Sequence, residues 1–269
     1  MAETRATPSW LLALGREPPP ALIELEGESY QLERIFKHDF FAYTALYRGE
    51  RRRVVLKIGR KASLCGLPLG WIGRFNAAHE SAVFRAVDDL EIVPRFTGRW
   101  GKYGITHEYV EGHSLERDER VPDDFFTRLG LGLADIHRRG IAYVDLEKCE
   151  NVLVGNDGRP YLFDFQISWR WPARWGGELW PIAWLRRRFQ AGDRYHLTKL
   201  QLRTRPDLFT PEALAAAKHR PFLNRLHNGL TRPFTLLRRL VLKHIDPGRK
   251  RERGEHSERG RVRAPRGVD

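Results

Sequence analysis

Two carboxylates and an amide stand close together in the sequence, around the pattern of a short β-hairpin. Asp145 and Asn151 precede the first of two apolar runs, and Asp164 directly follows the second. Asn156-Asp157-Gly158 separates the runs, and Asp-Gly between apolar segments is a strong hairpin signal. A hairpin would gather the three side chains at one end of a sheet. Their oxygens suit Mg²⁺, which usually binds one or two carboxylates together with substrate phosphates.

A lysine inside an apolar strand is a second candidate for chemistry. Lys57 lies within Val54–Ile58, and a lysine is costly to bury unless it is paired. The alternative is an edge-strand lysine that points to solvent. The next segment, Phe75–Val87, repeats apolar residues at helical spacing and is expected to form a helix.

The order of these motifs resembles the catalytic core of the protein-kinase-like superfamily, which carries H-R-D-L-x-x-x-N, a hairpin and then D-F-G. Here the first motif reads Tyr143-Val144-Asp145-Leu146 followed by Asn151, and the second reads Asp164-Phe165-Gln166. Tyr and Val replace His and Arg, and Gln166 replaces the last Gly. Asn151 stands six positions after Asp145, one more than in the usual pattern.

The resemblance implies a role for each residue of the two motifs. Asp145 would accept the proton of the substrate hydroxyl, and Asn151 and Asp164 would hold Mg²⁺.

It also implies a nucleotide site. Lys57 would bind the phosphates of ATP and pair with a helix glutamate, for which Glu80 is the candidate. Glu91 is the weaker alternative because it falls beyond the expected helix end. The stretch His107–Gly112 resembles the kinase hinge, where the carbonyl of Glu108 and the backbone of Val110 would contact adenine; a strand that ends in a turn is the alternative.

One kinase feature is missing. The stretch 36–41, where kinases have a glycine-rich loop over the phosphates, contains no glycine, so its backbone cannot approach phosphates as closely. Lys37 or His38 would then be the source of positive charge. An ordinary solvated turn is the alternative.

The predicted fold class is α+β, with a bilobal protein-kinase-like arrangement of a small β-rich N-lobe and a mostly helical C-lobe. The expected divisions are a loosely held N-terminal arm (1–25), the N-lobe (26–112), the C-lobe (113–246) and a disordered basic tail (247–269). The expected N-lobe strands are Tyr30–Ile35, Phe41–Tyr47, Arg53–Ile58, Ile92–Phe96 and Tyr103–Tyr109.

In the C-lobe, a helix capped by Asp123 or Asp124 is expected to end at Gly140. The resemblance gives His137 a structural role under the catalytic loop and makes Asp193 the candidate for a buried carboxylate that braces this loop. Two later helices are expected at Ala213–His219 and Phe234–Ile245.

Composition limits the partners. The net charge is +13 and the pI about 10.1, which favours an acidic partner such as nucleic acid, anionic lipid or a phosphorylated glycan. Nothing else resembles a nucleic-acid module, so that partner is not expected. No stretch is long and apolar enough to span a bilayer, and we expect a cytoplasmic protein. The two cysteines, Cys65 and Cys149, form no metal-site spacing.

Five of the eight tryptophans fall between Trp169 and Phe189, interleaved with arginines. This composition is typical either of a lipid interface or of a Trp-rich core patch under a short helix. No A-P-E motif, which protein kinases carry to dock peptides, stands between Asp164 and Asp193.

The short segment after Asp164, the basic charge and the Trp/Arg stretch are similar to the bacterial lipopolysaccharide-core kinases, which phosphorylate heptose or Kdo sugars on a glycolipid. The resemblance implies ATP- and Mg²⁺-dependent phosphoryl transfer to a glycolipid or sugar hydroxyl, peripheral to an anionic membrane surface. The alternatives are a Ser/Thr protein kinase and a catalytically inactive pseudokinase that acts as a scaffold at the membrane.

Overall fold

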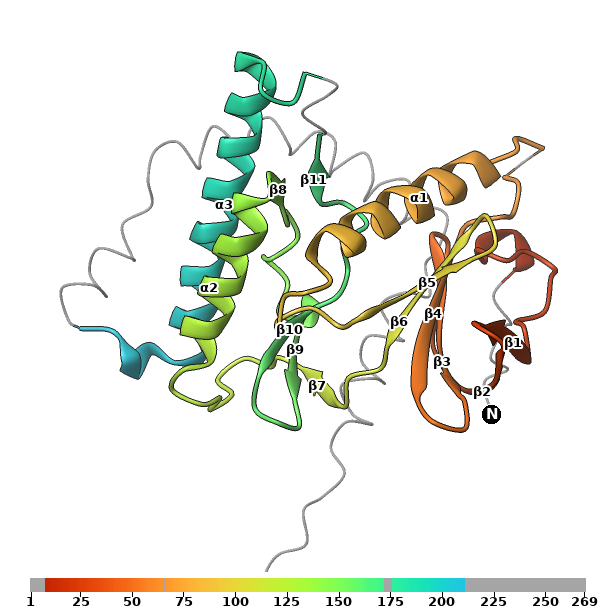
Figure 1. Cartoon of the computed structure of the whole chain (residues 1–269), viewed down its shortest axis with the longest axis horizontal. Helices are drawn as coiled ribbons and strands as arrows, with labels where there is room; N and C mark the ends of the chain where they lie inside the picture. The colour runs from red at the N-terminus through yellow and green to blue at the C-terminus, as the bar shows by residue number, and fades with distance from the viewer. Residues whose placement is uncertain (1–7, 65, 172–175, 211–269) are drawn as a thin grey trace, which may run out of the picture. The chain divides into compact units, whose positions relative to one another are not determined.

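A curled antiparallel sheet and three α-helices make up most of the described part of the chain (Figure 1). The computed structural model describes residues 8–64, 66–171 and 176–210, all within the unit Met1–Lys218. The fold class of this part is α+β, as predicted. The expected helices Ala213–His219 and Phe234–Ile245 and the tail 247–269 lie outside the described residues.

The main sheet has six strands in the order β1-β2-β3-β4-β6-β5. They are β1 (Leu22–Leu25), β2 (Glu28–His38), β3 (Ala42–Arg48), β4 (Arg53–Gly59), β5 (Phe96–Trp100) and β6 (Gly104–Glu108). Along β4, Leu56 and Ile58 are buried in the apolar cluster on one face of the sheet. Lys57 stands between them, so strand alternation directs its side chain to the other face.

Two sequence expectations about this sheet are wrong. The expected strand Ile92–Phe96 is displaced, because Ile92 and Val93 are buried in a turn and β5 begins only at Phe96. Within residues 8–25, the expected loose arm is also wrong, since β1 pairs with β2 and the segment before β1 is packed. Ala13 is fully buried; its N–H donates to the carbonyl of Asp39 at 2.8 Å.

Helix α1 (Gly70–Val87) packs against β4, β5 and β6. Glycines permit its close approach: a Cβ on Gly59 would lie 2.9 Å from the Cα of Gly73, and a Cβ on Gly73 would lie 2.2 Å from the carbonyl oxygen of Arg60. The start of α1 is therefore pressed against the end of β4, which carries Lys57.

The remaining elements surround the predicted hairpin. The antiparallel pair β9 (Val152–Gly155) and β10 (Pro160–Leu162) confirms that hairpin, and β7 (Gly112–Ser114) pairs with β9. A two-stranded ladder joins β8 (Ile141–Ala142) to β11 (Trp169–Arg170). Helices α2 (Phe125–Arg138) and α3 (Trp180–Thr204) lie side by side next to this ladder (Figure 1).

The ends of α2 differ in how well the sequence predicted them. The stop at Gly140 is confirmed, with a left-handed φ of 75°. At the other end, Asp124 occupies the predicted N-cap position, but neither aspartate makes a side-chain cap bond to the helix. Asp124 pairs with Arg128, and Asp123 with Arg205.

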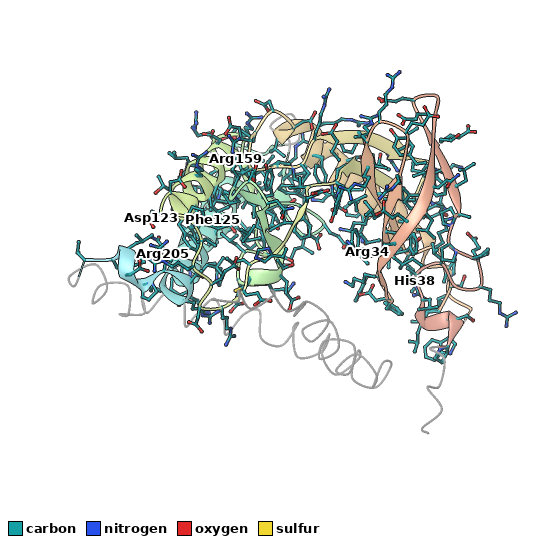
Figure 2. The ribbon with its side chains drawn as sticks, turned by 90° about the horizontal axis from the view of Figure 1, so that it is seen from below. Arg34, His38, Asp123, Phe125, Arg159 and Arg205 are labelled. Carbon is teal, nitrogen blue, oxygen red and sulfur yellow. The ribbon has the colours of Figure 1, made fainter. Side chains whose placement is uncertain are left out.

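Buried Arg205 follows α3 and fixes its end to the start of α2. Figure 2 shows Arg205 beside Asp123, close to Phe125 at the start of α2; the Arg205–Asp123 distance is 2.6 Å. Arg205 also donates to Asp207 and to the carbonyl of Val121. Of the helices in the described residues, none has the length and apolar character needed to cross a membrane.

Candidate functional site

Lys57 joins three elements that lie far apart in the sequence. Its ammonium is 2.8 Å from Oε1 of Glu80 on α1 and 2.8 Å from Oδ1 of Asp164, which follows β10. The predicted pairing of Lys57 with Glu80 is confirmed. Glu91 is exposed and instead lies 3.7 Å from Arg159.

The charges of this cluster depend on one another. Burial alone would lower the pKa of Lys57, but Glu80 and Asp164 outweigh it and raise that pKa, so the lysine stays protonated. Burial acts against ionisation of Asp164, yet Lys57 holds the pKa of this carboxyl at about 2. Burial raises the pKa of Glu80 despite the opposing effect of Lys57. Asp164 is therefore an anion at neutral pH, the form that can bind a cation.

The loop that carries Asp145 is braced by α3. Asp193 is 1% exposed and accepts hydrogen bonds from the backbone N–H groups of Tyr143 at 2.8 Å and Val144 at 2.7 Å. Its carboxylate also lies 2.9 Å from Nε2 of His137. The predicted bracing role of Asp193 and the structural place of His137 are both confirmed. Gln190 adds support, since its amide donates to the carbonyls of His137 and Ile141.

Val144 stands at an unusual backbone angle. Its φ is 72°, in the left-handed region that β-branched residues avoid. Because Asp193 binds the N–H groups of both Tyr143 and Val144, it helps to hold this conformation. The loop immediately before Asp145 is therefore fixed in a strained shape.

Asp145 and Asn151 lie together at the end of this loop. The amide of Asn151 donates through Nδ2 to the main-chain carbonyl of Asp145 at 2.9 Å, and Lys148 binds the Asp145 carboxylate at 2.5 Å. The 3-10 turn Cys149–Asn151 takes up the extra residue of the motif. With Nδ2 engaged, the oxygen of the Asn151 amide is the atom left to meet a metal ion. This donor chemistry, one amide oxygen and the ionised carboxylate of Asp164, fits Mg²⁺.

A chain of aromatic contacts connects the loop, the second motif and α1. Tyr143 and Phe165 meet edge to face with ring centroids 5.3 Å apart, and Phe165 meets Phe84 in the same way at 5.0 Å. Phe84 stacks on Phe96 and on His107. Because Phe165 follows Asp164 and Phe84 lies one helical turn after Glu80, these contacts fix the positions of both carboxylates.

The segment that resembles a hinge ends β6. The carbonyl of Glu108 accepts a hydrogen bond from Nδ1 of buried His107 at 2.8 Å. Burial lowers the pKa of His107 to about 4, so its ring is neutral at pH 7. Among the described residues, the backbone of Val110 makes no hydrogen bond, which leaves it available to a ligand.

The glycine-free stretch forms a tight and firmly held turn. Asp39 accepts hydrogen bonds from the N–H groups of Phe41 and Ala42. The guanidinium of buried Arg60 donates to the carbonyls of Phe40 at 2.9 Å and Trp10 at 2.8 Å. The packed N-terminal segment therefore holds the turn in place, and it is not an ordinary solvated turn.

The two proposed sources of charge, which stand at the end of β2 just before this turn, differ. His38 accepts a hydrogen bond from the N–H of Leu14, and burial lowers its pKa, so it is not the expected cation. Lys37 is half exposed, lies 2.9 Å from Asp39 and contributes to the lowered pKa of Asp164. Of the two, Lys37 alone places positive charge near the cluster.

The Trp/Arg stretch contains both partly buried and exposed indole rings. Trp169 is partly buried against Trp171 and Phe189, with ring centroids 6.2 Å and 5.2 Å away. Trp180 and Trp184 are 78% and 55% exposed at the start of α3. Residues 172–175 are outside the described part.

No protein-family model matches this chain, and no curated protein matches it. What the region can do chemically therefore follows from its own geometry. The structure brings Lys57, Glu80 and Asp164 into direct contact and places Asn151 against Asp145.

Sequence reasoning missed four supporting residues: Gln190, Arg60, Lys148 and Phe84. Gln190 had a usable signal, since it precedes Asp193 by three residues and shares its helix face. Buried Arg60 has no local signal, because its partners are carbonyls that the fold brings from elsewhere in the chain.

Proposed function

We propose that this chain is a bilobal protein-kinase-like phosphotransferase that uses ATP and Mg²⁺ to phosphorylate a hydroxyl. The main sheet and α1 would form the N-lobe, and the hairpin, α2 and α3 the C-lobe. The observation that carries the proposal is Lys57, whose ammonium lies 2.8 Å from both Glu80 and Asp164. A lysine that is held by two carboxylates from separate elements is suited to donate hydrogen bonds to phosphate oxygens.

Each residue has a distinct part in this proposal. Lys57, held by Glu80, would bind the nucleotide phosphates, and Asp164 with the amide oxygen of Asn151 would hold Mg²⁺. The metal, when bound, would neutralise charge on the phosphates. Asp145 would orient the acceptor hydroxyl and take its proton. Glu108 and Val110 would meet the adenine through backbone groups.

Lys37 would replace part of the missing glycine-rich loop. The turn after β2 is held by Arg60 and by the N-terminal segment, so its backbone cannot fold down over phosphates. The ammonium of Lys37 acts at a greater distance and already affects Asp164 electrostatically. We expect phosphate binding here to depend on side-chain charge instead of backbone N–H groups.

For the acceptor, we propose a sugar of a lipopolysaccharide-type glycolipid, reached by a cytoplasmic protein at the inner surface of the membrane. The net charge of +13 and the exposed Trp180 and Trp184 support this choice over a protein acceptor. The firmly held turn favours one alternative, a pseudokinase that binds nucleotide without transferring phosphate.

The first experiment is a thermal-shift measurement with MgATP, ATP alone and Mg²⁺ alone. A ligand that binds the folded state must raise the melting temperature. We expect the largest shift with MgATP, and we expect Asp164→Asn and Glu80→Gln to lose most of it. Glu91→Gln is the matched control, because it removes the alternative glutamate, and it should retain the full shift. No shift of the unmodified protein at saturating MgATP would rule out the nucleotide site.

The second experiment separates an enzyme from a scaffold. Asp145→Asn should keep the MgATP shift but lose about 10²–10⁴-fold in the rate of phosphate transfer. Transfer from γ-labelled ATP would be measured to lipopolysaccharide stripped of its phosphates and to a generic protein substrate. Label on the protein alone would favour a protein kinase. A shift without transfer to either substrate would favour the scaffold.

A further inference from the structure

A basic cavity of about 580 Å³ lies away from the Lys57 cluster. The end of α2, strand β11 and the first turns of α3 surround it, and these elements lie next to one another in Figure 1. Its lining residues are His137, Arg138, Arg139, Gly140, Arg170, Trp171, Glu178, Arg186, Arg187 and Gln190. We call it the arginine pocket.

The charges of the arginine pocket are incompletely balanced. Three of its five arginines pair with a carboxylate: Arg138 with Asp135, Arg139 with Asp89, and Arg186 with Glu178.

The other two, Arg170 and Arg187, make no side-chain hydrogen bond or salt bridge within the described part of the chain. Two guanidinium groups without a carboxylate partner carry two positive charges, which would balance the two negative charges of a phosphate monoester dianion. Guanidinium also presents the paired N–H groups that bind phosphate oxygens in a bidentate manner.

The surroundings of the arginine pocket are apolar and exposed. Trp171 lines it at 42% exposure, and Trp180 and Trp184 stand on the same helix end as Arg187, at 78% and 55%. Tryptophan beside arginine is typical of protein surfaces that enter the headgroup region of a membrane. A soluble anion would use the arginines and have no need of exposed indoles.

We propose that the arginine pocket binds the phosphate monoester headgroup of a membrane lipid, with Trp180 and Trp184 inserted into the adjoining interface. Arg170 and Arg187 are the recognition residues. Binding at this pocket requires no phosphoryl transfer and no contact with Lys57. The lipid proposal can therefore be tested independently of the proposed kinase activity.

The test is sedimentation of the full-length protein with phosphatidylcholine vesicles that contain either phosphatidic acid or phosphatidylserine at equal surface charge. Phosphatidic acid carries a phosphate monoester, and phosphatidylserine does not. We expect phosphatidic acid vesicles to bind at least tenfold more tightly. Arg170→Gln with Arg187→Gln should remove that preference and leave the MgATP thermal shift intact.

The matched control is Arg51→Gln with Arg95→Gln, which removes the same charge from exposed arginines outside the cavity. It should weaken vesicle binding less than threefold. Equal loss in both double variants, or equal binding of the two vesicle types, would mean that a diffuse basic surface is responsible and would overturn the proposal.

Trp180→Ala with Trp184→Ala separates a lipid from a soluble ligand. We expect this variant to bind phosphatidic acid vesicles at least fivefold more weakly, while its affinity for inorganic phosphate in calorimetry stays unchanged. Vesicle binding that does not depend on the tryptophans, together with tight binding of inorganic phosphate, would identify a soluble anion as the ligand and refute the assignment to lipid.

Discussion

Substitution of Val144 tests whether the loop before Asp145 is held under strain. Glycine normally makes a protein less stable than alanine by about 0.5–1 kcal/mol, because the unfolded chain gains freedom. At φ 72° the order should reverse, since any residue with a Cβ pays about 1–2 kcal/mol in the left-handed region. We expect Val144→Gly to be more stable than Val144→Ala, by roughly 0 to 1.5 kcal/mol.

The assay is urea unfolding of the two variants beside the unmodified protein, with equal slopes required for comparison. The two variants lose similar side-chain contacts, so their difference reports the backbone at this one position. If the alanine variant is clearly more stable than the glycine variant, the left-handed conformation does not exist in solution and the argument for strain fails.

The same loop gives a second measurement at Asp193. Asparagine has nearly the same shape but only one acceptor oxygen, so at least one of the N–H groups of Tyr143 and Val144 would face an NH₂ group. A buried hydrogen bond to a charged group contributes about 1.5–3 kcal/mol, and we expect Asp193→Asn to cost about 3 kcal/mol. A cost below about 1 kcal/mol would show that Asp193 does not brace the loop.

Three further predictions concern the main sheet and the turn after β2. Lys37→Met should weaken MgATP binding in calorimetry about three- to tenfold, whereas Lys37→Arg should retain it; equal affinities in both would remove Lys37 from the site. Arg60→Met leaves buried carbonyls without a donor and should cost about 3 kcal/mol in urea unfolding, while a loss under 1 kcal/mol would contradict its bracing role. Because the pKa of His107 falls from 6.5 in the unfolded chain to about 4, its contribution to stability is complete above pH 6.5 and is lost as pH falls towards 4. The unfolding free energy of His107→Gln should therefore fall by about 2 kcal/mol less between pH 7 and pH 5 than that of the unmodified protein. If both proteins lose the same free energy over this pH range, the low pKa is disproved.

Lys57, Glu80 and the hairpin share one property, a local pattern that fixes their orientation, whereas the place of Asp193 followed only from the family resemblance. Lys57 lies between two residues of β4 that face the apolar cluster, and Glu80 lies on a helix with a clear apolar stripe. The two side chains therefore face each other when α1 packs on the sheet. The turn Asp157-Gly158 likewise determines which ends of β9 and β10 meet.

The errors arise where distant parts of the chain decide the outcome. The proline-rich composition before Ala21 suggested a loose arm, but the carbonyls of Trp10 and Ala13 bind Arg60 and the backbone after it. Asp124 stands at the N-cap of α2 but makes no side-chain cap bond, because arginines pair with the carboxylates of Asp123 and Asp124, and one of them, Arg205, is about eighty residues away. A composition or capping rule cannot include such partners.

The N-terminal segment that we expected to be loose holds the turn after β2, and this bears on the proposed nucleotide site. A glycine-rich loop gains affinity from backbone N–H groups but must order itself around each nucleotide, which has an entropic cost. Here that cost is met on folding, because Arg60 and the N-terminal segment already fix the turn. In the proposed nucleotide site, the consequence would be fewer phosphate contacts but less order to acquire on binding. If this reasoning holds, removal of residues 1–15 should loosen the turn and weaken MgATP binding, with a more unfavourable binding entropy in calorimetry. Unchanged affinity and entropy after that truncation would show that the turn does not contribute to the nucleotide site.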